Sequence, residues 1–322
     1  MSAFPAARLH VVSGKGGTGK TTVAGALAFA LARDGRRVLL AEVEGRQGIA
    51  ALFEIPPLPY AERRVARTAG GGEVYALAID PEQALLEYLE MFYNLRRAGR
   101  ALKRIGAIDF ATTVAPGLRD VLLTGKVKEA VGRHVKGRRV YDAVVLDAPP
   151  TGRIVRFLNV SNEIAGVAKV GPIRKQAEAV MALLHSAETA VHIVTLLEEM
   201  PVQETIDGVR DLQAASLPVG AVIVNMVREP QLPPADLARA ESGQLDERAL
   251  AGDFETAGLD LGPDVVKVLA DEAAEHARRV ALERTERVEL EGLGRPLYEL
   301  PLLPDNVDVA ALHRLATVLA GA

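Results

Sequence analysis

Residues 8–22 of the chain are Arg-Leu-His-Val-Val-Ser-Gly-Lys-Gly-Gly-Thr-Gly-Lys-Thr-Thr. The apolar run 9–12 predicts a short buried strand, and a helical pattern begins at Lys20 and continues to Ala32. Two glycines separated by four residues and followed by Lys-Thr form the phosphate-binding P-loop pattern. The strand before the loop and the helix after it are the context that this pattern requires. We therefore expect a nucleotide-binding protein built around this loop.

Each residue type in the loop has a physical role toward phosphate. Glycines allow positive φ angles, so that successive backbone N–H groups point at one anion. The helix that begins at Lys20 adds its positive N-terminal end, and the Lys20 ammonium reaches the β- and γ-phosphates. The Thr21 hydroxyl is expected to bind Mg²⁺. The predicted nucleotide contacts of the loop are Gly14, Lys15, Gly16, Gly17, Thr18, Gly19, Lys20, Thr21 and Thr22.

A second motif, built around an acidic residue, lies at residues 141–153. The run Tyr-Asp-Ala-Val-Val-Leu-Asp predicts a core strand that ends at Asp147, which is the Walker B arrangement. We expect Asp147 to bind Mg²⁺ through a water, because Mg²⁺ keeps much of its hydration shell. The residues that follow it are Ala-Pro-Pro-Thr-Gly-Arg, and their glycine lets a backbone N–H approach a γ-phosphate. The predicted second switch comprises Asp147, Pro150, Thr151, Gly152 and Arg153.

Two motifs resemble those of one P-loop branch. Gly-Lys-Gly-Gly-Thr-Gly-Lys-Thr-Thr at 14–22 resembles the deviant Walker A loop, and Asp-Ala-Pro-Pro-Thr-Gly-Arg at 147–153 resembles the second switch of the arsenical-pump and tail-anchored-protein-targeting ATPases. The chain is similar to the bacterial "anion-transporting ATPase" members of that family. The resemblance implies a dimer in which Lys15 reaches across to the partner's nucleotide as a catalytic cation, beside Lys20.

The first switch is where the chain departs from the family pattern. Residues 44–48, Glu-Gly-Arg-Gln-Gly, follow a buried strand and match by position the family's Asp-Pro-Ala-His. The resemblance places Glu44, Gly45 and Arg46 in this switch and gives Glu44 the role of orienting the attacking water. Glu42 is the alternative candidate for that role. Arg153, where the family has histidine, is a second departure.

The adenine pocket is predicted from the same resemblance. The strand 219–225 ends in Asn225, an amide that both accepts and donates hydrogen bonds. The resemblance gives Asn225 the recognition of adenine and closes the pocket with a loop that contains Pro301, Pro304 and Asp305.

The order of elements predicts the fold class. Apolar strands near 8–13, 37–43, 73–79, 141–147, 190–196, 219–225 and 296–303 are mostly separated by helical patterns. This order predicts a doubly wound α/β fold with a mainly parallel sheet. We expect one P-loop ATPase domain over residues 1–322. Helical insertions are predicted near 81–135 and 154–186, and a charged helical segment near 228–292.

Composition excludes several classes of site. The chain has no cysteine, which excludes disulfides, thiolate zinc sites and the Cys-x-x-Cys zinc staple of the tail-anchored-targeting relatives. The net charge of −4 offers no basic field for nucleic acid. We see no signal peptide and no apolar run of about 18 residues. The predicted nucleotide site leads us to expect a cytoplasmic protein.

Three functions remain open at this stage. The first is a Mg²⁺-ATP-dependent ATPase that acts as a nucleotide-switched dimer and moves a helical surface for a client or membrane partner. The second is a nucleotide-binding regulatory or scaffold subunit with little turnover, paired with a related catalytic subunit. The third is a partitioning-type positioning ATPase. The client, and the choice between homodimer and heterodimer, do not follow from the sequence.

Overall fold

An eight-stranded sheet forms the centre of the computed structural model, which describes residues 7–93, 116–159, 172–304 and 307–321. The strand order is β10-β9-β8-β1-β7-β2-β4-β3, and every neighbouring pair is parallel except β3 with β4. The strands are β1 (Leu9–Gly14), β2 (Arg37–Glu42), β3 (Arg63–Arg67), β4 (Glu73–Ala78), β7 (Ala143–Asp147), β8 (Thr189–Thr195), β9 (Val219–Val227) and β10 (Leu297–Pro301). A separate hairpin pairs β5 (His134–Val135) with β6 (Arg138–Arg139).

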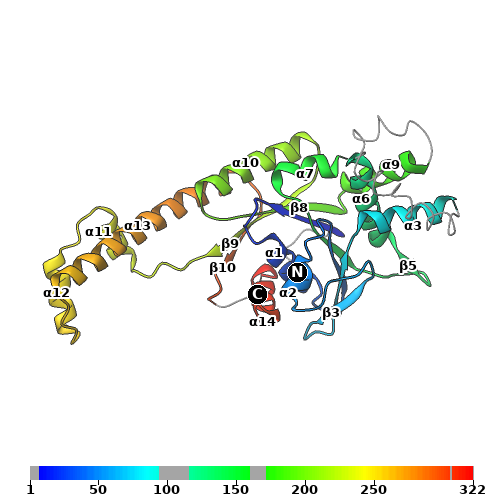
Figure 1. The fold of residues 1–322 in the computed structure, drawn as a ribbon. Coiled ribbons are helices and arrows are strands. Elements are labelled where there is room, and N and C mark those ends of the chain that lie inside the picture. The colour runs from blue at the N-terminus through cyan, green and yellow to red at the C-terminus, as the bar shows by residue number, and fades with distance from the viewer. Residues whose placement is uncertain (1–6, 94–115, 160–171, 305–306, 322) are drawn as a thin grey trace.

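Helices cover both faces of this sheet (Figure 1). One face packs against α1 (Lys20–Leu31), α2 (Gly48–Leu52) and α14 (Val309–Leu319). The other packs against α6 (Pro116–Gly132), α7 (Thr151–Leu158), α9 (Pro172–Leu184) and α10 (Glu199–Ala214), with α3 (Pro81–Tyr93) beside α6. Successive residues of a strand face opposite sides, so Val11 belongs to one core and Val12 to the other. The predicted doubly wound, mainly parallel fold is confirmed.

The chain between β9 and β10 forms a helical arm, which extends from the β10 edge of the sheet. It spans residues 228–292 and consists of α11 (Pro234–Glu241), α12 (Glu247–Thr256) and α13 (Pro263–Glu291). The 29 residues of α13 make a helix about 43 Å long at 1.5 Å per residue. Figure 1 shows α12 and the beginning of α13 far from the sheet. The arm occupies the charged helical segment that the sequence indicated.

Two buried histidines, His10 of β1 and His192 of β8, are hydrogen-bonded to each other in the middle of the sheet. The backbone N–H of Ala221 donates to Nδ1 of His192 at 3.0 Å, so the proton of His192 is on Nε2 and is donated to Nδ1 of His10, also at 3.0 Å. Nε2 of His10 then donates to the carbonyl of Ala7 at 3.1 Å. Burial lowers the pKa of His10 to about 4 and lowers that of His192 as well. Both rings are therefore neutral, fully bonded parts of the sheet.

The seven predicted strands agree with the structure to within two residues at each end, but two features were missed. β3 is an edge strand with the sequence Arg-Arg-Val-Ala-Arg. It was not predicted because its charged residues interrupt the apolar run by which the other strands were found. The β5–β6 hairpin is too short and polar to leave a pattern. Parts of both predicted helical insertions, residues 94–115 and 160–171, lie outside the described residues.

Candidate nucleotide site

The carboxyl ends of three adjacent strands meet at the candidate site. β7 lies between β1 and β2, and the register pairs Asp147 with Val12 on one side and with Glu42 on the other. The P-loop follows β1, the first switch follows β2, and the second switch follows β7. Ligands of open α/β sheets bind beyond this edge. The topology therefore brings together three segments, although the P-loop and the second switch are more than 100 residues apart in the sequence.

The P-loop is held from two sides. Gly19 has φ +83°, and a Cβ on it would lie 2.3 Å from Nδ2 of Asn225, so only glycine fits there. The same amide nitrogen donates to the carbonyl of Thr18 at 2.9 Å. The buried Ser13 hydroxyl donates to the carbonyl of Pro149 at 2.7 Å, which joins β1 to the second switch. The loop geometry is thus fixed by β9 and by the segment after β7.

The two predicted magnesium ligands lie against each other. The Thr21 hydroxyl donates to Oδ2 of Asp147 at 2.6 Å. Burial raises the pKa of Asp147 to about 6, against the opposing effects of Thr21 and Lys20. Burial also lowers the pKa of Lys20, which the charges of Asp147 and Glu44 oppose, and its ammonium donates to the carbonyl of Lys15 at 3.2 Å. A hydroxyl and a buried carboxylate beside a lysine are a donor set that fits Mg²⁺ with a phosphate.

The two glutamates of the first switch occupy different positions. Glu42 is buried, and its carboxylate accepts the backbone N–H groups of Gln47 at 2.9 Å and Ile49 at 3.0 Å. It therefore anchors the switch loop. The side chain of Glu44 is only 20% exposed, and the residue lines a small cavity of about 60 Å³. The cavity is lined by Lys20, Thr21, Glu42, Glu44, Arg46, Gly48, Asp147 and Ala148.

The two departures from the family pattern face each other. An Arg153 guanidinium nitrogen lies 3.5 Å from Oε1 of Glu44, and Nε of Arg46 lies 3.8 Å from the other carboxylate oxygen. Pro150 precedes α7, Thr151 begins it, and Gly152 is exposed in its first turn. Glu44 and Arg153 therefore join the first switch to the second, a contact that neither motif showed on its own.

Lys15 contacts a residue that no sequence motif marked. Its ammonium lies 2.8 Å from Oε1 of Glu204 in α10. Gly16 and Gly17, next to it, are exposed. Sequence reasoning also missed Ser13 and the anchoring role of Glu42. The signal available for Glu42 was its place as an acid at the end of an apolar strand, whereas Glu204 had none.

The residues predicted around adenine are only partly assembled. Asn225 is buried within β9 rather than at its end, and its amide nitrogen is bound to the P-loop. Pro301 ends β10 and lines an open cavity of about 910 Å³ between the sheet edge and α13. Pro304 is exposed in the loop after β10, and Asp305 lies outside the described residues.

Comparison with known proteins identifies the family. Residues 7–187 match the anion-transporting ATPase family. The chain belongs to this family. It is 54% identical to ATPase BagA of Mycobacterium tuberculosis, over 97% of this chain and 92% of that protein. It is 25% identical to the arsenical pump-driving ATPases of Escherichia coli and Acidiphilium multivorum, over 74% of this chain and 42% of each of theirs.

Membership in this anion-transporting ATPase family confirms the resemblance drawn from the two motifs and the expectation of an ATPase. The matched range includes the P-loop and both switches, and it ends before the helical arm. Across the described residues, no helix has the length and the apolar character needed to cross a membrane.

Proposed function

We propose that this family member binds Mg²⁺-ATP at residues 14–22 and works as a nucleotide-switched dimer. One observation carries the proposal: Lys20, Thr21 and Asp147 converge with Glu44 around one cavity at the carboxyl edge of the sheet. In-line phosphoryl transfer needs positioned cations, a metal site and an oriented nucleophile, with little covalent chemistry from the protein. These four side chains supply the matching groups.

The roles follow from position and charge. Lys20 neutralises charge on the β- and γ-phosphates, and Thr21 with Asp147 would hold Mg²⁺, which would supply further positive charge against the phosphates. Glu44 orients the attacking water, because Glu42 is already committed to two backbone N–H groups. Lys15 adds a cation to the partner's site, where charge develops in the transition state.

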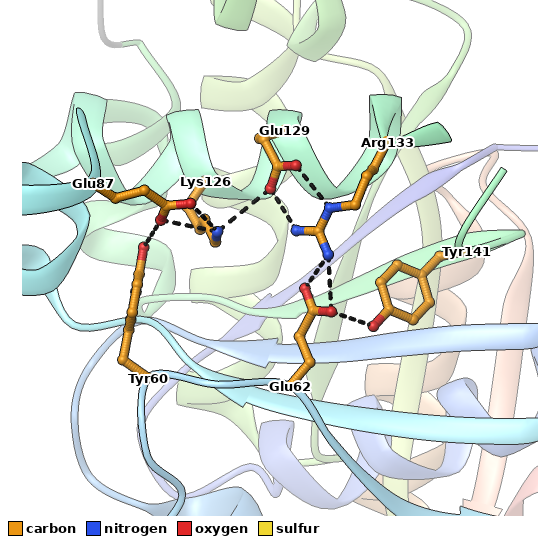
Figure 2. A network of polar contacts seen from close by, with 7 residues as sticks. All are labelled: Tyr60, Glu62, Glu87, Lys126, Glu129, Arg133 and Tyr141. Carbon is orange, nitrogen blue, oxygen red and sulfur yellow. Dashed lines mark hydrogen bonds and ion pairs between the residues drawn. The ribbon is translucent and has the colours of Figure 1, made fainter. Parts of the chain in front are cut away.

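A polar network supports coupling between the switches and the helices beyond them (Figure 2). Tyr60 and Glu62 lie in the segment after α2, and Tyr141 precedes β7. Tyr60 donates to Glu87 of α3 at 2.5 Å, and Tyr141 donates to Glu62 at 2.6 Å. Lys126 of α6 pairs with Glu87, and Arg133, just after α6, pairs with Glu62. Glu129 of α6 pairs with both Lys126 and Arg133 and so joins the two halves of the network.

This network gives a path for movement. The chain segments that follow the first switch and precede Asp147 are bonded to α3 and α6 through charged side chains, which hold a fixed geometry better than apolar contacts. We therefore propose that hydrolysis, by relaxing the switches, moves α3 and α6 and the client surface that they carry. The client itself is not identified by these contacts.

Trans-complementation tests the dimer directly. Lys20→Ala and Lys15→Ala chains are each expected to lose hydrolysis. Mixed in equal amounts, they form hetero-pairs in which the Lys15→Ala subunit keeps its own Lys20 and receives Lys15 from its partner. Random pairing then restores about a quarter of the wild-type rate. A mixture no more active than its components would contradict the role of Lys15 in trans.

A second candidate function has its own supporting observation. Arg153 and Arg46 flank the Glu44 carboxylate, which weakens its ability to hold a water. This arrangement favours a nucleotide-binding regulatory subunit that pairs with a related ATPase chain. Phosphate release by the purified chain over a wide range of protein concentration separates the two functions. A rate per chain that rises with concentration supports a self-sufficient dimer, whereas ATP binding with no release at any concentration supports the regulatory subunit.

A further inference from the structure

The two P-loop lysines point in different directions. Lys20 stays inside the loop, where its ammonium donates to the carbonyl of Lys15. The Lys15 side chain extends away from the loop to α10, where Nζ lies 2.8 Å from Oε1 of Glu204. Both side chains of this pair are partly exposed, at 30% and 40%. The lysine proposed to act in trans is therefore bound within its own subunit.

The position of Glu204 is fixed by the helix that carries it. Val202 and Val209 are buried in the core beneath α10. Gly208 is four residues after Glu204, so the two lie on the same side of the helix. A Cβ on Gly208 would lie 3.3 Å from Cγ2 of Thr151, the first residue of α7. One side of α10 thus faces both the P-loop lysine and the second switch, while the helix also contacts α13 of the arm.

The ion pair between Lys15 and Glu204 should be weak enough to break reversibly. Ion pairs between partly exposed groups are weak, because water already solvates both charges. A triphosphate carries more negative charge than one carboxylate and accepts several hydrogen bonds from an ammonium. A nucleotide that approaches in a facing subunit can therefore displace Glu204 from Lys15.

We infer that Glu204 is a positioning residue that holds Lys15 in its own subunit until a partner's nucleotide displaces it. This inference rests on the proposed function of Lys15 in trans. Glu204 partly neutralises Lys15 in the unpaired chain, so the cation is withheld from phosphate until two subunits meet. Because α10 also touches Thr151, displacement of Glu204 and movement of the second switch involve the same helix.

The first experiment measures the contact without any activity. The full-length chain and its Glu204→Gln variant are acetylated with an N-hydroxysuccinimide ester in the absence of nucleotide, and modification of Lys15 is followed by peptide mass spectrometry. Lys267, exposed on the arm, is the internal reference. We expect Glu204→Gln to raise the rate at Lys15 about threefold or more, because the amine loses its ion-pair partner. Equal rates at Lys15 in both proteins would overturn the inference.

The matched control is Asp207→Asn on the same helix. Asp207 is exposed and contacts Gln203 at 3.1 Å and Arg210 at 3.6 Å. Asp207→Asn removes the same charge as Glu204→Gln, and these two contacts of Asp207 lie within α10, so its Lys15 labelling should equal that of the wild type. An equal rise at Lys15 in this control would show a general charge effect and would overturn a specific role for Glu204.

The second experiment measures ATP hydrolysis against protein concentration. Glu204→Gln is expected to reach half of its maximal rate at a protein concentration at least threefold lower than the wild type, with the KM for ATP unchanged. A fall in maximal rate would mean that Glu204 is needed in the active state and would contradict the inference. Lys15→Ala separates this from a failure of the proposed function: if that variant hydrolyses ATP as fast as the wild type, Lys15 has no role in trans, whatever the labelling shows.

Discussion

The nucleotide end of the molecule and the helical arm are built at very different densities. Helix α1, which follows the P-loop, buries nearly every residue from Val23 to Leu31. Helix α12 of the arm buries none, and the 29 residues of α13 bury six, at positions 266, 270, 277, 280, 286 and 290. The same kind of substitution should therefore have large effects at one end and small effects at the other.

Charge divides the molecule in the same way. Residues 228–292 contain 16 acidic and 8 basic residues, whereas the whole chain has 42 and 38. The arm is thus strongly acidic, and the remainder of the chain is net positive. The modest net charge of −4 is the sum of −8 in the arm and +4 in the remainder of the chain. The net charge of the whole chain therefore describes neither the arm nor the remainder, and each region has to be tested separately.

The largest contrast is expected for lysine removal. Lys20→Ala should lower ATP hydrolysis by about 100-fold or more, as when one preorganised charge donor is lost from a phosphate site. Lys267→Ala in the arm removes the same group from an exposed surface and should leave hydrolysis within a factor of two of wild type. Phosphate release at saturating ATP measures both. Comparable losses in the two variants would remove the distinction between the regions.

Glycine-to-alanine substitutions should differ in sign. A Cβ on Gly72, beside β4, would lie 1.6 Å from the carbonyl oxygen of Ala32, so Gly72→Ala should destabilise the chain by about 3 kcal/mol or more. Nothing lies within 4 Å of a Cβ on Gly252 in α12, so Gly252→Ala should be neutral or stabilise by up to about 1 kcal/mol. Urea unfolding gives both free energies. Destabilisation of the arm variant to the same extent would mean that α12 is packed more tightly than its exposure indicates.

The pH dependence of stability should originate in the sheet. The pKa of His10 is about 4 in the fold and about 6.5 in the unfolded chain, so the unfolded state binds more protons between these values. Stability present above pH 6.5 is then lost as the pH falls, by roughly 3 kcal/mol for His10 at pH 4.

Urea unfolding at pH 7.5, 6 and 5 tests this loss. His10→Leu removes one of the titrating groups and should reduce the loss of stability over that range, whatever its effect at pH 7.5. His192, whose pKa burial also lowers, keeps a contribution of the same sign, and Asp147, whose pKa burial raises, contributes with the opposite sign in both proteins. The control His276→Gln replaces a partly exposed histidine of the arm, outside the sheet, and should keep the wild-type slope. An unchanged slope in His10→Leu would assign the proton uptake to other groups.

The smallest effect is expected on the exposed apolar surface of the arm. The Val268 side chain is 55% exposed, and Val268→Ala should change the free energy of unfolding by no more than about 0.5 kcal/mol. Val11→Ala, at a fully buried position of β1, should cost about 2 kcal/mol. Thermal unfolding of the two variants side by side measures the difference, and a cost above 1 kcal/mol at Val268 would show that the arm is covered in solution.

The sequence by itself determined the elements that depend on local pattern. The P-loop was predicted because its glycines, lysine and threonine act at fixed spacing within one strand–loop–helix unit. Most of the seven strands were predicted because strands inside a parallel sheet are continuous apolar runs. Asp147 was selected for the same reason, as an acid that ends such a run. These features can be predicted from the local sequence, without knowing which segments pack beside them.

Only the tertiary structure decided which side chains meet across the sheet. Asp147 reaches Thr21, Glu44 faces Arg153, Lys15 is held by Glu204, and Asn225 braces Thr18. It also separated Glu42, which anchors a loop, from Glu44, which faces the cavity. The physical reason is that a contact between distant residues depends on strand order, register and helix placement. A single sequence encodes those jointly rather than at any one position.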